Sequence, residues 1–223
     1  MAFPNSQLAD PSTYDTALDG LAANIPLRIS RSAALVDRGA FRAQKDWQQI
    51  FSSLPSPNYA GTAAPQYGFV SACVPEALPD RAELVGYVVE LTFLIDDVMD
   101  DATSPAGVAA APYMADLMRA HDMTRRGAEA DAALVGGSPV ARLLVAVRRA
   151  MLAVDPGRAR DAFRWLETWV KAALTRPRGE KEIGDLDDYL EYRRSNVASQ
   201  YVVLWNLGEQ SPGLTRETGP CLG

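Results

Sequence analysis

The stretch Glu90-Leu-Thr-Phe-Leu-Ile-Asp-Asp-Val-Met-Asp-Asp101 joins an apolar run to a group of acidic residues. Before the acids, apolar or small side chains recur every three or four positions, which is the spacing of one face of an α-helix. These positions are Leu84, Val85, Val88, Leu91, Thr92 and Ile95. The stretch therefore predicts a core helix that ends in a cluster of carboxylates, formed by Asp96, Asp97, Asp100 and Asp101.

The acidic cluster is electrostatically unfavourable unless something neutralises it. Asp96 and Asp100 are four positions apart and Asp97 and Asp100 three apart, so their like charges are neighbours on a helix, at the end where the helix dipole already disfavours anions. A divalent cation removes both costs, and carboxylate oxygens suit Mg²⁺, which shares the rest of its shell with water and phosphate. The alternative is a solvated acidic helix end. The apolar residues that directly precede the acids favour the metal site.

Composition excludes several classes of function. The chain has 223 residues, 48% of them hydrophobic and 22% charged, which is typical of a globular protein with one main domain. The net charge of −6 and the lack of a basic stripe disfavour nucleic-acid binding, and no apolar run approaches the ~18 residues of a membrane span. Cys73 and Cys221 are too far apart in sequence to indicate a zinc site or a disulfide framework. With no signal peptide at the N-terminus, we expect a cytoplasmic protein.

Helical periodicity continues through most of the chain, and we find no convincing strand pattern. Residues 1–30 are rich in turn-forming residues and predict an irregular lead. Asp155-Pro156-Gly157 resembles an N-cap followed by the first turn of a helix. The predicted helices cover approximately 32–41, 45–54, 67–74, 80–101, 108–121, 139–154, 156–176 and 186–207, with a short helical turn over 127–134. Because most of these helices are joined by short connections, the sequence predicts an all-α bundle of antiparallel helices.

The last of these helices carries a second candidate site at Arg193. Its apolar stripe consists of Leu186, Tyr189, Leu190, Val197, Tyr201 and Leu204. Arg193 falls on this stripe, where an unpaired charge is very costly, and its guanidinium matches phosphate oxygens. The alternatives are an ion pair with a structural carboxylate such as Glu167, or a side chain that extends to water. Asn196 lies one turn further on the same side.

Three segments carry a shared pattern: Phe69-Val-Ser-Ala-Cys-Val-Pro-Glu-Ala-Leu-Pro-Asp-Arg81, Glu90-Leu-Thr-Phe-Leu-Ile-Asp-Asp-Val-Met-Asp100 and Asp188-Tyr-Leu-Glu-Tyr-Arg-Arg-Ser-Asn-Val197. In this order they resemble class I terpene synthases, and most closely the cyclase domain of fungal chimeric cyclase–prenyltransferase enzymes. The resemblance covers about residues 25–207 and implies the all-α class I terpenoid synthase fold. Residues 1–24 would be an irregular lead and residues 208–223 an unrelated, disordered tail.

The resemblance also implies an activity and the residues that perform it. The enzyme would be a Mg²⁺-dependent lyase that ionises a linear isoprenyl diphosphate, such as geranylgeranyl or geranylfarnesyl diphosphate, and cyclises the cation. Asp96 would be the principal Mg²⁺ ligand, supported by Asp97 and Asp100. Arg193 would sense the diphosphate, with Arg194 as the alternative and Asn196 close by. Phe69 and Phe93 would line the hydrocarbon pocket, ordinary core packing being the alternative for either ring.

The sequence departs from the family pattern near its end. A second metal motif of the type Asn-Asp-x-x-Ser-x-x-x-Glu should follow Arg193 on a later helix, and neither it nor a prenyltransferase domain occurs before Gly223. We therefore expect a C-terminally truncated cyclase with little or no activity of its own. The competing interpretations are a non-catalytic helical fragment or interaction protein and a prenyltransferase, which would need a second aspartate-rich motif.

Overall fold

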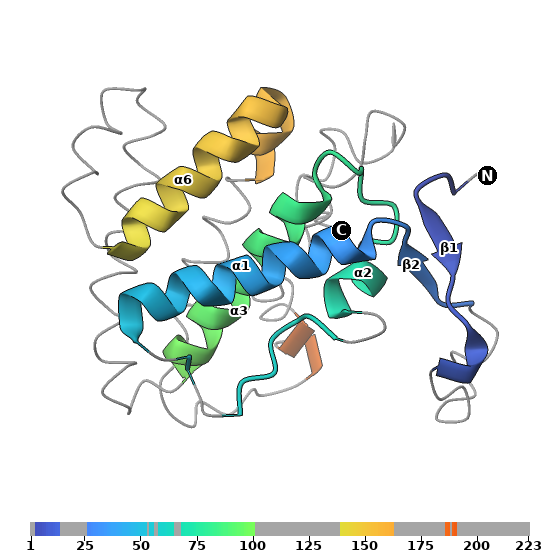
Figure 1. Cartoon of the computed structure of the whole chain (residues 1–223), viewed down its shortest axis with the longest axis horizontal. Coiled ribbons are helices and arrows are strands. Elements are labelled where there is room, and N and C mark those ends of the chain that lie inside the picture. Colours follow the sequence, from blue (N-terminus) through green and yellow to red (C-terminus); the bar gives the residue numbers. More distant parts are fainter. Residues whose placement is uncertain are drawn as a thin grey trace.

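The computed structural model describes residues 3–13, 26–52, 54–55, 58–64, 68–100, 139–162, 186–187 and 189–190. Within these residues the protein is mainly helical (Figure 1), as the sequence predicted. The helices are α1 (Ala33–Phe51), α2 (Phe69–Cys73), α3 (Ala82–Asp100) and α6 (Pro139–Val154), and residues 156–162, 186–187 and 189–190 are also helical. Of the helices in these ranges, none has both the length and the hydropathy needed to cross a bilayer.

Helix α1 is a single helix, although the sequence suggested two short ones. A buried stripe formed by Val36, Ala40, Ala43 and Trp47 passes through the expected break. Because this stripe packs against one neighbour, α3, along its length, tertiary contact keeps the helix continuous. The helix ends at Ser52, whose left-handed backbone (φ 59°) lets its N–H donate to the carbonyl of Gln48.

The crossing of α1 and α3 forms the centre of the described core (Figure 1). Two glycines allow the backbones to touch: a Cβ atom at Gly39 would lie 1.9 Å from the carbonyl oxygen of Glu83, and one at Gly86 would lie 1.9 Å from that of Val36. Only glycine permits so close an approach. Around this contact the core is apolar, and its members include Val36, Ala43, Trp47, Val85, Val88, Leu91, Leu94, Ile95, Val147 and Met151.

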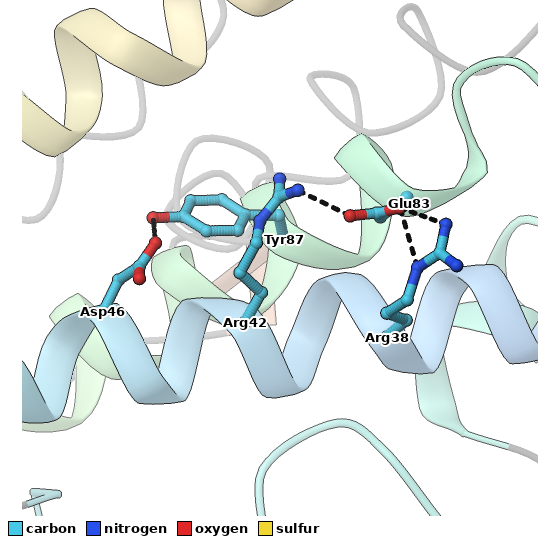
Figure 2. Close-up of polar contacts among 5 residues, drawn as sticks. All are labelled: Arg38, Arg42, Asp46, Glu83 and Tyr87. Atoms are coloured by element: carbon cyan, nitrogen blue, oxygen red, sulfur yellow. Dashed lines mark hydrogen bonds and ion pairs between the residues drawn. The ribbon is translucent and has the colours of Figure 1, made fainter.

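Polar side chains cover one edge of the α1–α3 crossing (Figure 2). Glu83 accepts hydrogen bonds from Arg38 and Arg42, which are one helical turn apart on α1. One turn further along each helix, the Tyr87 hydroxyl donates to Asp46 at 2.9 Å, and Arg42 stacks 4.7 Å above the Tyr87 ring. The two arginines are largely exposed, so these ion pairs add little to stability.

A small antiparallel β pair precedes α1, in a region that the sequence predicted to be irregular. Strand β1 (Ser6–Leu8) pairs with β2 (Arg28–Ser30), with Ser6 opposite Ser30. Arg28 donates to the hydroxyl of Ser6 at 2.7 Å, and the backbone N–H of Asn5 donates to Glu76 at 3.1 Å. Strands of three residues are too short to show an alternating pattern, so tertiary contacts decide this pairing.

Asp155 connects the start of α3 to the end of α6. Its carboxylate accepts a hydrogen bond from the backbone N–H of Arg158 at 3.0 Å, which confirms the predicted N-cap before the helical residues 156–162. The same carboxylate pairs with Arg81 at 2.9 Å. Arg81 directly precedes α3 and is only 8% exposed, so this ion pair fixes where α3 begins relative to α6.

Candidate metal centre

Helix α3 changes from buried to accessible at its acidic end. Leu94 and Ile95 are buried in the core, Asp96 is half-buried and Asp97 is exposed. The acids therefore lie at the edge of the described core, directly after its last members on α3, Leu94 and Ile95. The side chain of Asp100 and all of Asp101 lie outside the described residues, so their predicted place in the cluster stays a prediction.

The two described carboxylates suit a hard cation. Neighbouring acids that remain accessible to water match the one or two carboxylates that Mg²⁺ usually takes from a protein. Among the side chains that the structure describes, no group of three or more His, Cys, Asp or Glu residues could hold a metal ion unaided. Asp96 and Asp97 therefore fit as part of a coordination shell that water and a phosphate ligand would complete.

The pKa of Tyr59 reflects the negative electrostatic potential at this end of α3. Burial raises the pKa of its hydroxyl, and the carboxylates of Glu90 and Asp97 raise this pKa further. Glu90 and Asp97 are seven residues apart, two helical turns on the same face of α3. The Tyr59 side chain packs against the core, and the effect of Asp97 on its pKa indicates that its hydroxyl lies near the acidic end of α3.

The two predicted pocket aromatics lie together. The rings of Phe69 in α2 and Phe93 in α3 meet edge to face, with centroids 5.5 Å apart. They remain 52% and 40% exposed, and their place in a hydrocarbon pocket stays a prediction. Phe93 precedes Asp96 by three residues and Asp97 by four, which places the aromatic pair on the same side of α3 as the acids. An apolar surface thus adjoins the candidate metal ligands.

The predicted diphosphate site lies outside the described residues. Arg193, Arg194 and Asn196 all belong to this part of the chain, so their roles stay predictions. The start of the predicted helix at residues 186–190 is helical where it is described, but its apolar side chains are exposed rather than buried, because no described element covers them; they are Leu186, Tyr189 and Leu190.

Sequence reasoning missed Glu90, which has no solvent exposure. Its carboxylate accepts hydrogen bonds from the backbone N–H of Thr62 at 2.7 Å, the Thr62 hydroxyl at 2.5 Å and the Gln44 side chain at 2.8 Å. The signal was an isolated acid between Val89 and Leu91 within a buried run, because an acid in a core must be paired. Gly61, with φ of 66°, lets the loop pass directly over this carboxylate.

The fold and the accessible acids define a helical protein with a candidate metal-binding end, and comparison with known proteins identifies its family. A family model described as terpene synthase family 2, C-terminal metal binding, matches residues 87–213, more than half of the chain and including the acidic end of α3. The chain belongs to this family of terpene synthases.

Curated relatives from fungi agree with this assignment. Phomopsene synthase of Phomopsis amygdali is 32% identical over 203 residues, 91% of this chain and 26% of that protein. Ophiobolin F synthase of Aspergillus clavatus is 32% identical over 206 residues, 92% of this chain and 26% of the relative. Preasperterpenoid A synthase of Talaromyces verruculosus is 40% identical over 102 residues, 46% of this chain and 13% of the relative. The chain thus spans about a quarter of the length of the first two proteins.

Proposed function

We propose that this chain contributes the Mg²⁺-binding part of a class I terpene cyclase, which ionises a linear isoprenyl diphosphate and cyclises the resulting cation. The observation that carries the proposal is the adjacency of two accessible carboxylates and an exposed aromatic pair on one side of α3. This combination matches a ligand with a charged head and a long apolar tail. By the resemblance to fungal chimeric terpene synthases, we propose geranylgeranyl or geranylfarnesyl diphosphate as the substrate.

Each residue has a defined role in this proposal. Asp96 and Asp97, together with Asp100, would hold Mg²⁺, which supplies Lewis-acid neutralisation of the diphosphate leaving group. Arg193, or alternatively Arg194, binds the diphosphate oxygens with Asn196 beside it. Phe69 and Phe93 pack against the hydrocarbon and keep water from it. Their ring faces stabilise positive charge on the isoprenoid cation by about 0.5–2 kcal/mol each.

The surroundings of the enzyme follow from the same resemblance. A prenyltransferase domain, as in the chimeric fungal enzymes, would supply the isoprenyl diphosphate. We place the protein in the cytoplasm, because Cys73 is an exposed free thiol and such thiols persist in reducing compartments.

Calorimetric titration of the chain with inorganic pyrophosphate, with and without Mg²⁺, tests the metal and diphosphate site. We expect binding only with Mg²⁺, and affinity lowered about tenfold or more by Asp96→Asn or Asp97→Asn. Asp161→Asn is the matched control, because Asp161, like Asp97, is an exposed helical aspartate but lies outside α3. Mg²⁺-independent binding, or equal affinity in all three variants, would contradict the proposal and favour a non-catalytic helical protein.

A further inference from the structure

The loop over residues 58–64 is attached to α3 through one buried carboxylate. Thr62 is 4% exposed and gives both its backbone N–H and its hydroxyl to Glu90. Because Thr62 makes two hydrogen bonds to the same buried side chain, and leaving such a group unsatisfied is costly, the position of Thr62 is closely determined. Gly61 has no room for a side chain, since a Cβ atom there would lie 2.6 Å from the Glu90 carboxylate. This segment therefore has one defined path across α3.

Thr62 also holds the first residue of α2 in position. Its carbonyl oxygen accepts a hydrogen bond from the backbone N–H of Phe69 at 2.8 Å, and Phe69 is the first residue of that short helix. The Phe69 ring in turn meets Phe93, which lies on α3 three residues after Glu90. A closed path thus runs from Glu90 through Thr62 and Phe69 to Phe93 and back along α3.

We propose that Glu90 and Thr62 are positioning residues for the aromatic pair, and that they set the affinity of the site for the hydrocarbon part of its ligand. This inference rests on the function proposed above and adds a determinant of substrate specificity to it. Helix α2 has only five residues, too few to be stable without tertiary contacts. The hydrogen bond from Phe69 to Thr62 is therefore a main constraint on the position of Phe69. Displacement of Phe69 would alter the apolar surface while the Asp96 and Asp97 carboxylates stay in place.

Two probes distinguish binding of the diphosphate from binding of the hydrocarbon. They are inorganic pyrophosphate and geranylgeranyl S-thiolodiphosphate, an analogue whose bridging C–S–P sulfur slows ionisation, each titrated with Mg²⁺. Thr62→Val removes the hydroxyl donor and keeps the side-chain shape. We expect it to weaken binding of the analogue about fivefold to tenfold, the size of the net contribution of one ordinary hydrogen bond, and to leave pyrophosphate affinity within about twofold. Thr62→Ser retains the donor and should restore analogue binding.

Gln44→Met provides the matched control. Gln44 also donates to Glu90, at 2.8 Å, but it belongs to α1 and takes no part in the path to Phe69. This variant should keep the ratio of the two affinities. Circular dichroism and a thermal melt on every variant establish that each is folded at the titration temperature.

The outcomes separate the two proposals. Suppose that wild type binds both probes. If Thr62→Val keeps the wild-type ratio of analogue affinity to pyrophosphate affinity, the positioning role is wrong and the metal site stands. The same conclusion follows if Thr62→Ser and Gln44→Met lose analogue binding as strongly as Thr62→Val. If Thr62→Val weakens both probes equally, Thr62 acts on the whole fold and the inference also fails. If wild type binds neither probe with Mg²⁺, the proposed function itself fails and takes this inference with it.

Discussion

Asp155 combines a local and a long-range role in one carboxylate. One oxygen caps the helical residues 156–162 through Arg158, and the other pairs with the nearly buried Arg81 at 2.9 Å. The cap could be predicted from the Asp-Pro-Gly sequence, because capping depends on adjacent residues. The ion pair joins positions far apart in the chain, so the sequence pattern carried no signal for it.

Two substitutions separate these roles of Asp155. Asp155→Asn keeps a good capping side chain but removes the charge that faces Arg81, and should lower the free energy of unfolding by about 2 kcal/mol. Asp155→Ala removes the cap as well and should cost about 1 kcal/mol more. Urea denaturation measures both values. Equal stability of the two variants would show that the cap contributes nothing.

The Asp155 contribution should also depend on pH. Burial alone would raise the pKa of this carboxyl, but the Arg158 N–H and the Arg81 guanidinium outweigh burial and hold the pKa below its ordinary value of 3.8. Because the pKa is lower in the folded than in the unfolded state, the stabilisation is complete above the unfolded value and is lost as the pH falls through the folded one. The difference in the free energy of unfolding between wild type and Asp155→Asn should therefore be constant near neutral pH and become smaller below about pH 4.

At the scale of helices, the α1–α3 crossing depends on glycine rather than on its surface ion pairs. The pattern of α3 was predicted almost to the residue, because its apolar positions recur regularly over 84–95. Helix α1 was divided in two, because the sequence alone did not show which neighbour covers Ala40 and Ala43. The backbone contact at Gly39 and Gly86 had no sequence signal, since a glycine within a helix usually indicates only weaker propensity.

Gly86→Ala should destabilise the protein even though alanine favours helix formation. The added Cβ would lie 1.9 Å from the backbone carbonyl of Val36, which belongs to a packed helix and cannot move alone. Overpacking of this kind should lower the free energy of unfolding by about 2 kcal/mol or more, against a helix-propensity gain of at most about 1 kcal/mol.

Gly157→Ala is the control for this effect. Its nearest atom would be 3.6 Å from the new Cβ, an ordinary contact, and Gly157 is exposed in a helical segment. This variant should be about 0.5 kcal/mol more stable than wild type. A Gly86→Ala protein with wild-type stability in urea would show that the helices can separate at little cost.

For the whole molecule, ligand binding and folding should be coupled through α3, which contributes both to the core and to the candidate metal centre. A ligand that binds only the folded state stabilises it, by about 2.7 kcal/mol at a concentration 100 times Kd. For a chain of this size, Mg²⁺ with pyrophosphate at that level should raise Tm by about 5–10 °C. Differential scanning fluorimetry should show no such rise for Asp96→Asn. A rise of the same size in that variant would place the ligand elsewhere.

The helical nature of the described segments could be predicted from the order of residues along the chain, because periodicity and helix caps are properties of neighbouring residues. The structure places Asp96 and Asp97 at the accessible end of α3 and the Phe69 ring against Phe93, while their roles in metal and substrate binding stay predictions. The β pair, the glycine contact between α1 and α3, and the Glu90–Thr62 connection emerged only once distant segments met. Each of these depends on which partner supplies a hydrogen bond or leaves room for a backbone, and that choice is made by packing in space.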